Sequence, residues 1–359
     1  MIGAASVLAL LVASAAGAAG AEIPAVGADP ASSLPPHIRR LTFFGERADW
    51  SPDGRRILFL SKTHGDAYEI DVETGALHLL TGGYPHAGYT RALYLSNGHV
   101  LLSGAAKLDP ADPGWSRTHA ELSVLDPASG QPPVRLGTEC AEGPTVSRRR
   151  LHVAWTIGHG QYPERFPKGV SQIREANLVY ENGVPRLANE RVVLDSRQLP
   201  FRCNLESQNF RPPEERELTF STYDYNVSES FRVDLQTGMV TNDTRTETLY
   251  EEPEGIFPDG QWTCIETDRD NGMAGAGHQY IDVWKLALDG SGRVERLTDF
   301  TRFPGFKASN PVVRDDGRFM AFQMAKVGDP AGVGRGIFVY DLLKAASTPN
   351  PKAPTTPTR

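Results

Sequence analysis

The stretch ADWSPDGRRILFLS, from Ala48 to Ser61, holds the pattern that decides the fold. Its Ser-Pro-Asp-Gly segment lies between two β-rich runs, and an Asp-Gly turn in that setting predicts a tight hairpin because glycine tolerates a positive φ. Two other segments repeat the pattern, GIFPDGQWTCIET (Gly255 to Thr267) and VVRDDGRFMAFQM (Val312 to Met324). Each of the three predicts a strand, a turn and a second strand.

The hairpin is the first half of a longer repeat. A third strand follows each copy, and in the first two copies a second turn leads to a fourth strand. Weaker copies fill the middle of the chain, so that hairpin turns recur 44 to 66 residues apart, at Gly54, Gly98, Arg149, Glu215, Gly260 and Gly317. Six four-stranded units with a period of roughly 40 to 50 residues and long loops predict an all-β, six-bladed β-propeller. A β-sandwich, the main alternative, does not explain the repeated Asp-Gly turn.

The two ends of the repeat region complement each other. The sixth unit stops after its third strand, at Leu342, whereas IRRLTFFG (Ile38 to Gly45) precedes the first unit and matches the fourth strand VERLTDF (Val294 to Phe300). We therefore predict that the N-terminal strand completes the last blade, which closes the ring and covers two sheet edges. The expected organisation is a linker over 22–37, a propeller over 38–342 and a disordered Pro/Thr-rich tail over 343–359.

The first 21 residues predict export. They contain no charged side chain, they include the apolar run VLALLV (Val7 to Val12), and Ala19 and Ala21 stand at the positions that signal peptidase reads. Residues 1–21 are therefore expected to be a signal peptide; the alternative, an uncleaved membrane anchor, is disfavoured because the segment is Ala/Gly-rich and a span needs ~20 apolar residues. We expect a periplasmic or secreted monomer without a membrane span after cleavage.

Composition narrows the function classes. The chain has 359 residues, with 37 Lys and Arg against 44 Asp and Glu, and this net charge of -7 disfavours nucleic acid as a partner. The three cysteines, Cys140, Cys203 and Cys264, form no Cys-x-x-Cys pair. They leave two alternatives open, one disulfide with an odd thiol or three buried thiols.

The repeats carry a family resemblance. The SPDGRRILFLS segment, the Asp-Gly turn and the Arg-Leu-Thr fourth strand resemble the repeats of TolB-like six-bladed propellers, and similar repeats occur in oligogalacturonate lyase and in the propellers of prolyl oligopeptidase-type enzymes. The resemblance covers roughly Ile38 to Leu342. No Gly-x-Ser-x-Gly motif is present, so a peptidase of the last type is set aside.

Function is expected in the loops of one face. In a propeller, the blade-joining loops and the loops between second and third strands open around the central funnel. Those loops hold several histidines, and imidazole, amide and carboxylate groups suit a divalent metal. The predicted metal ligands are His86, His159, His278 and Gln161, with Glu142 or Glu254 orienting the rings; the lyase family that the chain resembles binds a metal through His and Gln on this face.

Two functions remain open from the sequence. The first is a binding or scaffold module that presents its funnel to a protein partner or a glycan. The second is a metal-assisted lyase or hydrolase acting on an acidic oligosaccharide, in which Arg91, Arg202 or Lys307 would neutralise a substrate carboxylate. In the second case His159 or His278 would be the base, so the predicted catalytic residues are His159, His278 and Arg91.

Overall fold

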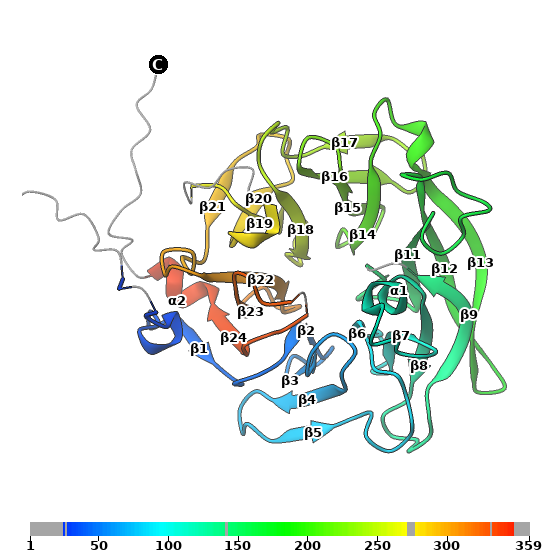
Figure 1. Ribbon diagram of the computed structural model, residues 1–359, viewed down its shortest axis with the longest axis horizontal. Helices are drawn as coiled ribbons and strands as arrows, with labels where there is room; N and C mark the ends of the chain where they lie inside the picture. The colour runs from blue at the N-terminus through cyan, green and yellow to red at the C-terminus, as the bar shows by residue number, and fades with distance from the viewer. Residues whose placement is uncertain (1–23, 26, 141–142, 271–276, 331, 348–359) are drawn as a thin grey trace, which may run out of the picture.

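The computed structural model describes residues 24–347, apart from 26, 141–142, 271–276 and 331. Within this part of the chain, six four-stranded antiparallel sheets stand around a central axis as the blades of a propeller (Figure 1). The predicted six-bladed β-propeller is therefore confirmed. The predicted signal peptide over 1–21 lies outside the described residues.

Within each blade the four strands are given in order from the central axis outward. Blade 1 comprises β2 (Glu46–Trp50), β3 (Arg56–Leu60), β4 (Ala67–Asp71) and β5 (Leu77–Leu79). Blade 2 comprises β6 (Arg91–Tyr94), β7 (Val100–Ala105), β8 (Ala120–Leu125) and β9 (Val134–Cys140). Blade 3 comprises β10 (Thr145–Val146), β11 (His152–Gly158), β12 (Ser171–Glu181) and β13 (Val184–Asp195).

The second half of the ring repeats this order. Blade 4 comprises β14 (Asn204–Phe210), β15 (Glu217–Tyr223), β16 (Ser228–Asp234) and β17 (Val240–Asn242). Blade 5 comprises β18 (Glu251–Ile256), β19 (Trp262–Thr267), β20 (Asp282–Ala287) and β21 (Val294–Arg296). Blade 6 comprises β22 (Phe306–Val313), β23 (Phe319–Lys326), β24 (Ile337–Asp341) and, from the start of the chain, β1 (Ile38–Arg40).

Blade 6 closes the ring as predicted. Strand β1 pairs antiparallel with β24, with Ile38 opposite Tyr340 and Arg40 opposite Phe338. The Arg40 guanidinium extends the contact by donating to the carbonyl oxygen of Arg335 at 2.7 Å. Residues about 300 positions apart thus share one sheet, and β1 covers the edge of β24 that would otherwise be unpaired.

The hairpin turns have the expected backbone. Gly54, Gly260 and Gly317 adopt φ values of 67°, 65° and 71°. Gly260 also lies so close to the preceding blade that a Cβ atom would stand 1.9 Å from the carbonyl oxygen of Pro212. The turn glycine therefore serves both the turn and the packing between blades.

Apolar side chains fill the space between neighbouring blades. Blades 6 and 1, for example, pack Ala321, Ile337 and Val339 against Trp50 and Phe59. The three cysteines are buried and none is joined to another in a disulfide, so of the two alternatives the structure has three buried thiols. Burial raises the pKa of Cys203 to about 12, so this thiol stays protonated at neutral pH.

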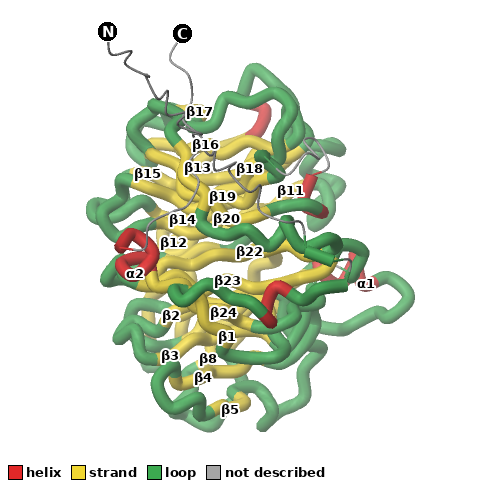
Figure 2. Tube along the Cα trace, turned by 90° about the vertical axis from the view of Figure 1, so that its left-hand side faces the viewer, coloured by secondary structure: helices red, strands yellow, loops and turns green. Residues whose placement is uncertain are grey.

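Short helices mark the two faces of the ring. Helix α1 (Pro113–Thr118) and helix α2 (Leu342–Ser347) lie at opposite faces when the ring is seen edge-on (Figure 2). Three 3-10 turns complete the elements, η1 (Pro30–Ser32), η2 (Ser196–Gln198) and η3 (Gly277–Gln279). The tail was expected to begin at residue 343, but the chain is helical through Ser347. The helix forms there because Leu342 and Ala345 pack on the core. No helix in the described part is long and apolar enough to cross a membrane.

Candidate functional site

The innermost strands of blades 1, 4, 5 and 6 share an irregularity. The register with the second strand shifts between Glu46 and Asp49, Ser207 and Asn209, Pro253 and Gly255, and Ser309 and Val312. A β-bulge of this kind re-aims a side chain. The bulged segments contain Arg47, Gln208, Glu254 and Asn310, and all four of these residues line the central channel.

Two of the bulges hold a non-glycine residue in the left-handed region. Arg47 has a φ of 55° and Asn310 a φ of 47°. Such a backbone persists only where neighbouring groups hold it. The Arg47 amide donates to Oε1 of Gln323 at 2.6 Å, and the Asn310 amide donates to the carboxylate of Glu266. Side chains of the second strands thus fix the bulges.

The channel contains two cavities that meet at a common floor. The upper cavity, here called the funnel, has a volume of about 380 Å³ and opens at the face that carries α1. The lower cavity has a volume of about 320 Å³ and reaches the hairpin turns of the opposite face. Both cavities are lined by Arg47, Arg91, Glu254 and Asn310, which form the floor between them.

Four carboxylates gather on one side of the funnel. We call Glu206 of blade 4 and Glu252, Glu254 and Glu266 of blade 5 the acidic arc. Glu252 accepts hydrogen bonds from Nε2 of Gln208 at 3.0 Å and from the hydroxyls of Tyr223 and Tyr250. The Tyr223 hydroxyl also lies 2.9 Å from Glu206, so this tyrosine joins blades 4 and 5.

Burial makes the acidic arc difficult to ionise. It raises the pKa of Glu252, Glu254 and Glu266 to about 8 each, and repulsion from neighbouring carboxylates in the arc acts in the same direction. Arg91 approaches two members of the arc, with its Nη2 3.6 Å from Glu206 and 3.9 Å from Glu254. These carboxyl groups therefore share protons near neutral pH.

Cations also line the funnel. We call Arg91 and Arg117 of blade 2 and Lys307 and Lys326 of blade 6 the basic arc. Arg117 is carried by α1, and this helix is anchored from both neighbouring blades. Nε2 of His64 lies 3.3 Å from the Pro113 carbonyl oxygen, and Nε2 of Gln161 donates to the Thr118 carbonyl oxygen at 2.7 Å.

Two of the predicted catalytic residues line the funnel. These are His278 and Arg91, and Lys307 lies beside them with its Nζ donating to the His278 carbonyl oxygen at 2.6 Å. Burial, with Lys307 and Arg117 nearby, lowers the pKa of His278, so the imidazole is neutral at pH 7. Burial also lowers the pKa of Lys307.

The other predicted site residues do not line the funnel. His86 uses both ring nitrogens locally, with Nε2 at 2.9 Å from Asp66 and Nδ1 accepting from the Gly88 amide. His159 has its Nδ1 at 2.7 Å from the Phe166 carbonyl oxygen. Gln161 accepts from the Gly158 amide at 2.8 Å while it anchors α1.

The structure places the four predicted metal ligands in different settings, and of the four His278 lines the funnel. Among the residues that the structure describes, no group of three or more His, Cys, Asp or Glu side chains is arranged to hold a metal ion. His86 and His159 have partners in their own loops, whereas Gln161 contacts both its own loop and α1 of blade 2. Of the two orienting carboxylates, Glu254 lies in the funnel floor, and Glu142 is outside the described residues.

Sequence reasoning overlooked part of the acidic arc. The sequence analysis predicted site residues in loops. It did not predict the four residues on or beside strands that also line the funnel, Glu206, Tyr223, Tyr250 and Glu266. The available signal was polar spacing on inner strands, as in Glu206 with Gln208 and Glu252 with Glu254. An inner strand that alternates toward polar side chains faces a channel and not a core.

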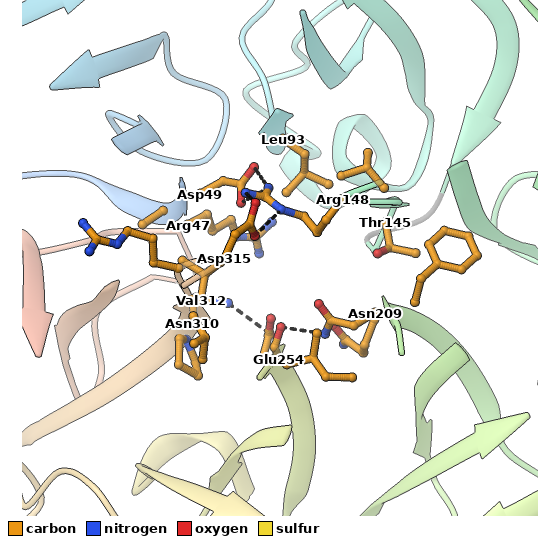
Figure 3. Close-up of a pocket in the computed structure, with 18 of the residues that line it drawn as sticks. Arg47, Asp49, Leu93, Thr145, Arg148, Asn209, Glu254, Asn310, Val312 and Asp315 are labelled. Carbon is orange, nitrogen blue, oxygen red and sulfur yellow. Dashed lines mark hydrogen bonds and ion pairs between the residues drawn. The ribbon is translucent and has the colours of Figure 1, made fainter. Parts of the chain in front are cut away.

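The lower cavity is bordered by an arginine that crosses between distant blades. Arg148, in the hairpin turn of blade 3, contacts Asp49 of blade 1 at 3.2 Å and Asp315 of blade 6 at 3.0 Å (Figure 3). Its Nη2 also donates to the Trp50 carbonyl oxygen at 2.8 Å. Burial raises the pKa of Asp49 to about 6, against the opposing effect of Arg148.

Comparisons with known proteins find similar folds among solved structures but no match in sequence. No protein-family model matches the chain, and no curated protein matches it in sequence. Among solved structures, a gluconolactonase from Xanthomonas campestris is similar with a TM-score of 0.53 and 13% identity, over 85% of this chain and 88% of that one. An oligogalacturonate lyase in complex with manganese is similar with a TM-score of 0.52 and 12% identity, over 86% and 78%.

TolB from Acinetobacter baumannii is also similar, with a TM-score of 0.44 and 15% identity over 78% of this chain. The similarity spans 65% of the length of that protein. The resemblance read from the repeats is confirmed at the level of the six-bladed propeller fold by the six blades of this chain and by the two structures with TM-scores above 0.5, at identities that carry no residue roles across.

Proposed function

We propose that this protein is an exported binding module whose funnel captures a polar ligand or partner. The observation that supports this is the convergence, in one cavity of about 380 Å³, of charged and hydrogen-bonding side chains from blades 1, 2, 4, 5 and 6. A concave site with convergent polar groups is the usual form of a binding site. Each blade contributes a few residues, so the ring as a whole shapes the site.

The rim of the funnel suits a glycan or a partner protein. Helix α1 presents Trp115, whose side chain is 39% exposed, on the same turn of chain as Arg117. The indole stacks on the ring of His119 at 4.4 Å between centroids, which holds it in one orientation. An oriented aromatic ring beside hydrogen-bonding groups suits a sugar face or an exposed side chain.

A glycan array followed by titration calorimetry tests the binding role. The variant Lys307→Met removes a funnel cation, and Arg149→Met is its control because Arg149 is exposed at the opposite face and donates to the Pro213 carbonyl oxygen. We expect ligands that bind the wild type and the control and bind Lys307→Met at least tenfold more weakly. Hits that all three proteins bind equally would place recognition outside the funnel.

Export is supported by the charge-free, apolar start of the chain over 1–21 and by Ala19 and Ala21 at the cleavage positions. Expression of the whole chain in a Gram-negative host, with fractionation and N-terminal sequencing, tests it. The expected product is periplasmic or secreted and begins at Glu22. A cytoplasmic product that keeps Met1 would contradict export.

Catalysis on an acidic oligosaccharide is the second candidate. It is favoured by the presence of Arg91, His278 and Lys307 in the same cavity as buried carboxyl groups. Arg91 and Lys307 would neutralise the substrate carboxylate, and the neutral His278 imidazole would accept a proton.

An activity assay separates this candidate from pure binding. Unsaturated products, followed by ultraviolet absorbance, and new reducing ends would be measured with oligogalacturonides. His278→Asn should abolish turnover, and His119→Asn, which alters a ring stacked on Trp115, should retain it. Absence of turnover by wild-type protein that binds the same oligosaccharides would leave the binding role.

A further inference from the structure

Apolar side chains form a ring around the lower cavity. Each blade contributes one of them from its innermost strand, and we call the ring the apolar collar: Ala48, Leu93, Val146, Phe210, Ile256 and Val312. On three of these strands the collar residue comes two positions after a residue of the floor, as Ile256 follows Glu254. The channel therefore changes from a polar to an apolar lining between the floor and the hairpin turns.

The collar leaves a space that an apolar ligand would fill. Leu93, Ile256 and Val312 keep part of their surface accessible, and a cavity of about 320 Å³ remains between the inner strands. Leu93 and Val312, from blades 2 and 6, approach this cavity from different sides (Figure 3). Covering accessible apolar surface with an apolar group is favourable. The collar thus suits an aliphatic chain.

The outer mouth of the lower cavity carries three arginines, from the hairpin turns of blades 3 and 6. Two of them, Arg148 and Arg314, form ion pairs with aspartates. The third, Arg149, is exposed, and its Nη1 donates to the Pro213 carbonyl oxygen at 2.9 Å. A guanidinium has further N–H donors at Nε and Nη2, so Arg149 can bind a carboxylate while it keeps this bond to a neutral oxygen.

From this arrangement we infer that the lower cavity binds a linear aliphatic carboxylate, with the chain inside the apolar collar and the carboxylate at Arg149. This site lies beyond the floor from the funnel and does not depend on the proposed function. A volume of about 320 Å³ equals roughly ten water-sized units of ~30 Å³. A methylene group is of similar size, so a chain of roughly ten carbons fits.

The orientation of the ligand follows from the cost of burying charge. A carboxylate at the outer mouth stays in contact with water, whereas a carboxylate at the floor would be enclosed. The floor also contains Glu254, which Arg91 already approaches at 3.9 Å, and Nη1 of Arg47 donates there to the Thr90 carbonyl oxygen at 2.6 Å. The apolar lining ends at this polar floor, so the floor limits the length of the chain.

A series of fatty acids measures the depth of the collar. Titration calorimetry below the micelle concentration would compare hexanoate, octanoate, decanoate and tetradecanoate with the wild-type protein. Each added methylene should tighten binding about fourfold until the chain reaches the floor, at roughly ten carbons. Affinity that does not depend on chain length, or that rises equally steeply up to tetradecanoate, would overturn the enclosed chain.

The head group is tested with 1-decanol and decylammonium, which keep the chain of decanoate. Wild-type protein should bind decanoate at least tenfold more tightly than either compound, and Arg149→Met should bind decanoate and decanol alike. Arg318→Met is the matched control, because Arg318 is exposed on the same face, lies 3.6 Å from Asp341 and does not line the cavity. Equal binding of all three compounds by the wild type, or an unchanged preference in Arg149→Met, would refute the assigned carboxylate site.

Two collar variants locate the chain. Val312→Thr keeps the shape but adds a hydroxyl, and Ile256→Phe fills part of the cavity, so each should weaken decanoate binding at least fivefold. Val312→Thr is nearly isosteric, so it should fold even if Ile256→Phe does not. Lys307→Met alters the funnel and should bind decanoate like the wild type, which separates this site from the proposed function. Wild-type affinity in folded Val312→Thr and Ile256→Phe would place the chain outside the collar and overturn the inference.

Discussion

Arg148 offers the sharpest test of how the ring is held together. Its guanidinium lies 3.2 Å from a carboxylate oxygen of Asp49 and donates to Asp315 at 3.0 Å and to the Trp50 carbonyl oxygen at 2.8 Å. Asp49 is only 3% exposed, and it also accepts hydrogen bonds from the backbone amides of Tyr94, at 2.6 Å, and Trp50. The variant Arg148→Met therefore leaves a buried carboxylate without its cation.

The expected loss can be worked from this environment. Removing one partner of a buried ion pair costs about 3 to 5 kcal/mol. The cost here is lower, because Asp315 is solvated and because Asp49, with a pKa of about 6, can take up a proton. We expect a loss of roughly 2 to 3 kcal/mol in the free energy of unfolding at pH 8.

The sign of the pH dependence follows from the raised pKa. Asp49 binds its proton more tightly in the folded state than in the unfolded state, so its contribution favours folding at low pH and is lost as pH rises through about 6. Without Arg148 this pKa rises further. The difference between variant and wild type should therefore be larger at pH 8 than at pH 5.

Chemical denaturation at both pH values measures the effect. Arg149→Met is the control, because this neighbouring arginine is exposed and donates to the Pro213 carbonyl oxygen at 2.9 Å, so its loss should cost less than about 0.5 kcal/mol. Adding Asp49→Asn to Arg148→Met should recover part of the stability. If Arg148→Met unfolds like Arg149→Met at pH 8, the cross-ring ion pair does not stabilise the propeller.

Three other predictions concern the frame of the site. Gly260→Val should destabilise by about 2 kcal/mol or more, since φ is 65° and a Cβ would stand 1.9 Å from the Pro212 carbonyl oxygen, whereas Gly290→Val, with open space around it, should cost less in the same melting assay. Deleting residues 38–45 removes β1 and should abolish cooperative unfolding or soluble yield; an unchanged melting transition would contradict ring closure. Gln161→Ala should increase hydrogen exchange over α1 with little change elsewhere, and unchanged exchange there would show that Gln161 does not anchor the helix.

Much of the fold could be predicted because its determinants are local. An Asp-Gly turn between two β-rich runs specifies a hairpin through the φ of one glycine, and three such hairpins with three weaker copies reveal a six-unit repeat. The missing fourth strand after Leu342 and the matching segment at Ile38 then identified how the ring closes. The same reasoning placed Arg91 and His278 at the channel, since blade-joining and second-to-third-strand loops open on one face.

The candidate site was decided by tertiary structure. Glu206, Tyr223 and Glu252 meet although they belong to three strands of two blades, and no spacing in the sequence encodes that meeting. The bulges that place Arg47 and Asn310 in the floor depend on Gln323 and Glu266 of other strands, whose side chains accept hydrogen bonds from the two backbone amides. A turn needs a few consecutive residues, whereas the channel needs six sheets in register around one axis; the sequence therefore determined the blades, and only their closure determined which side chains face each other.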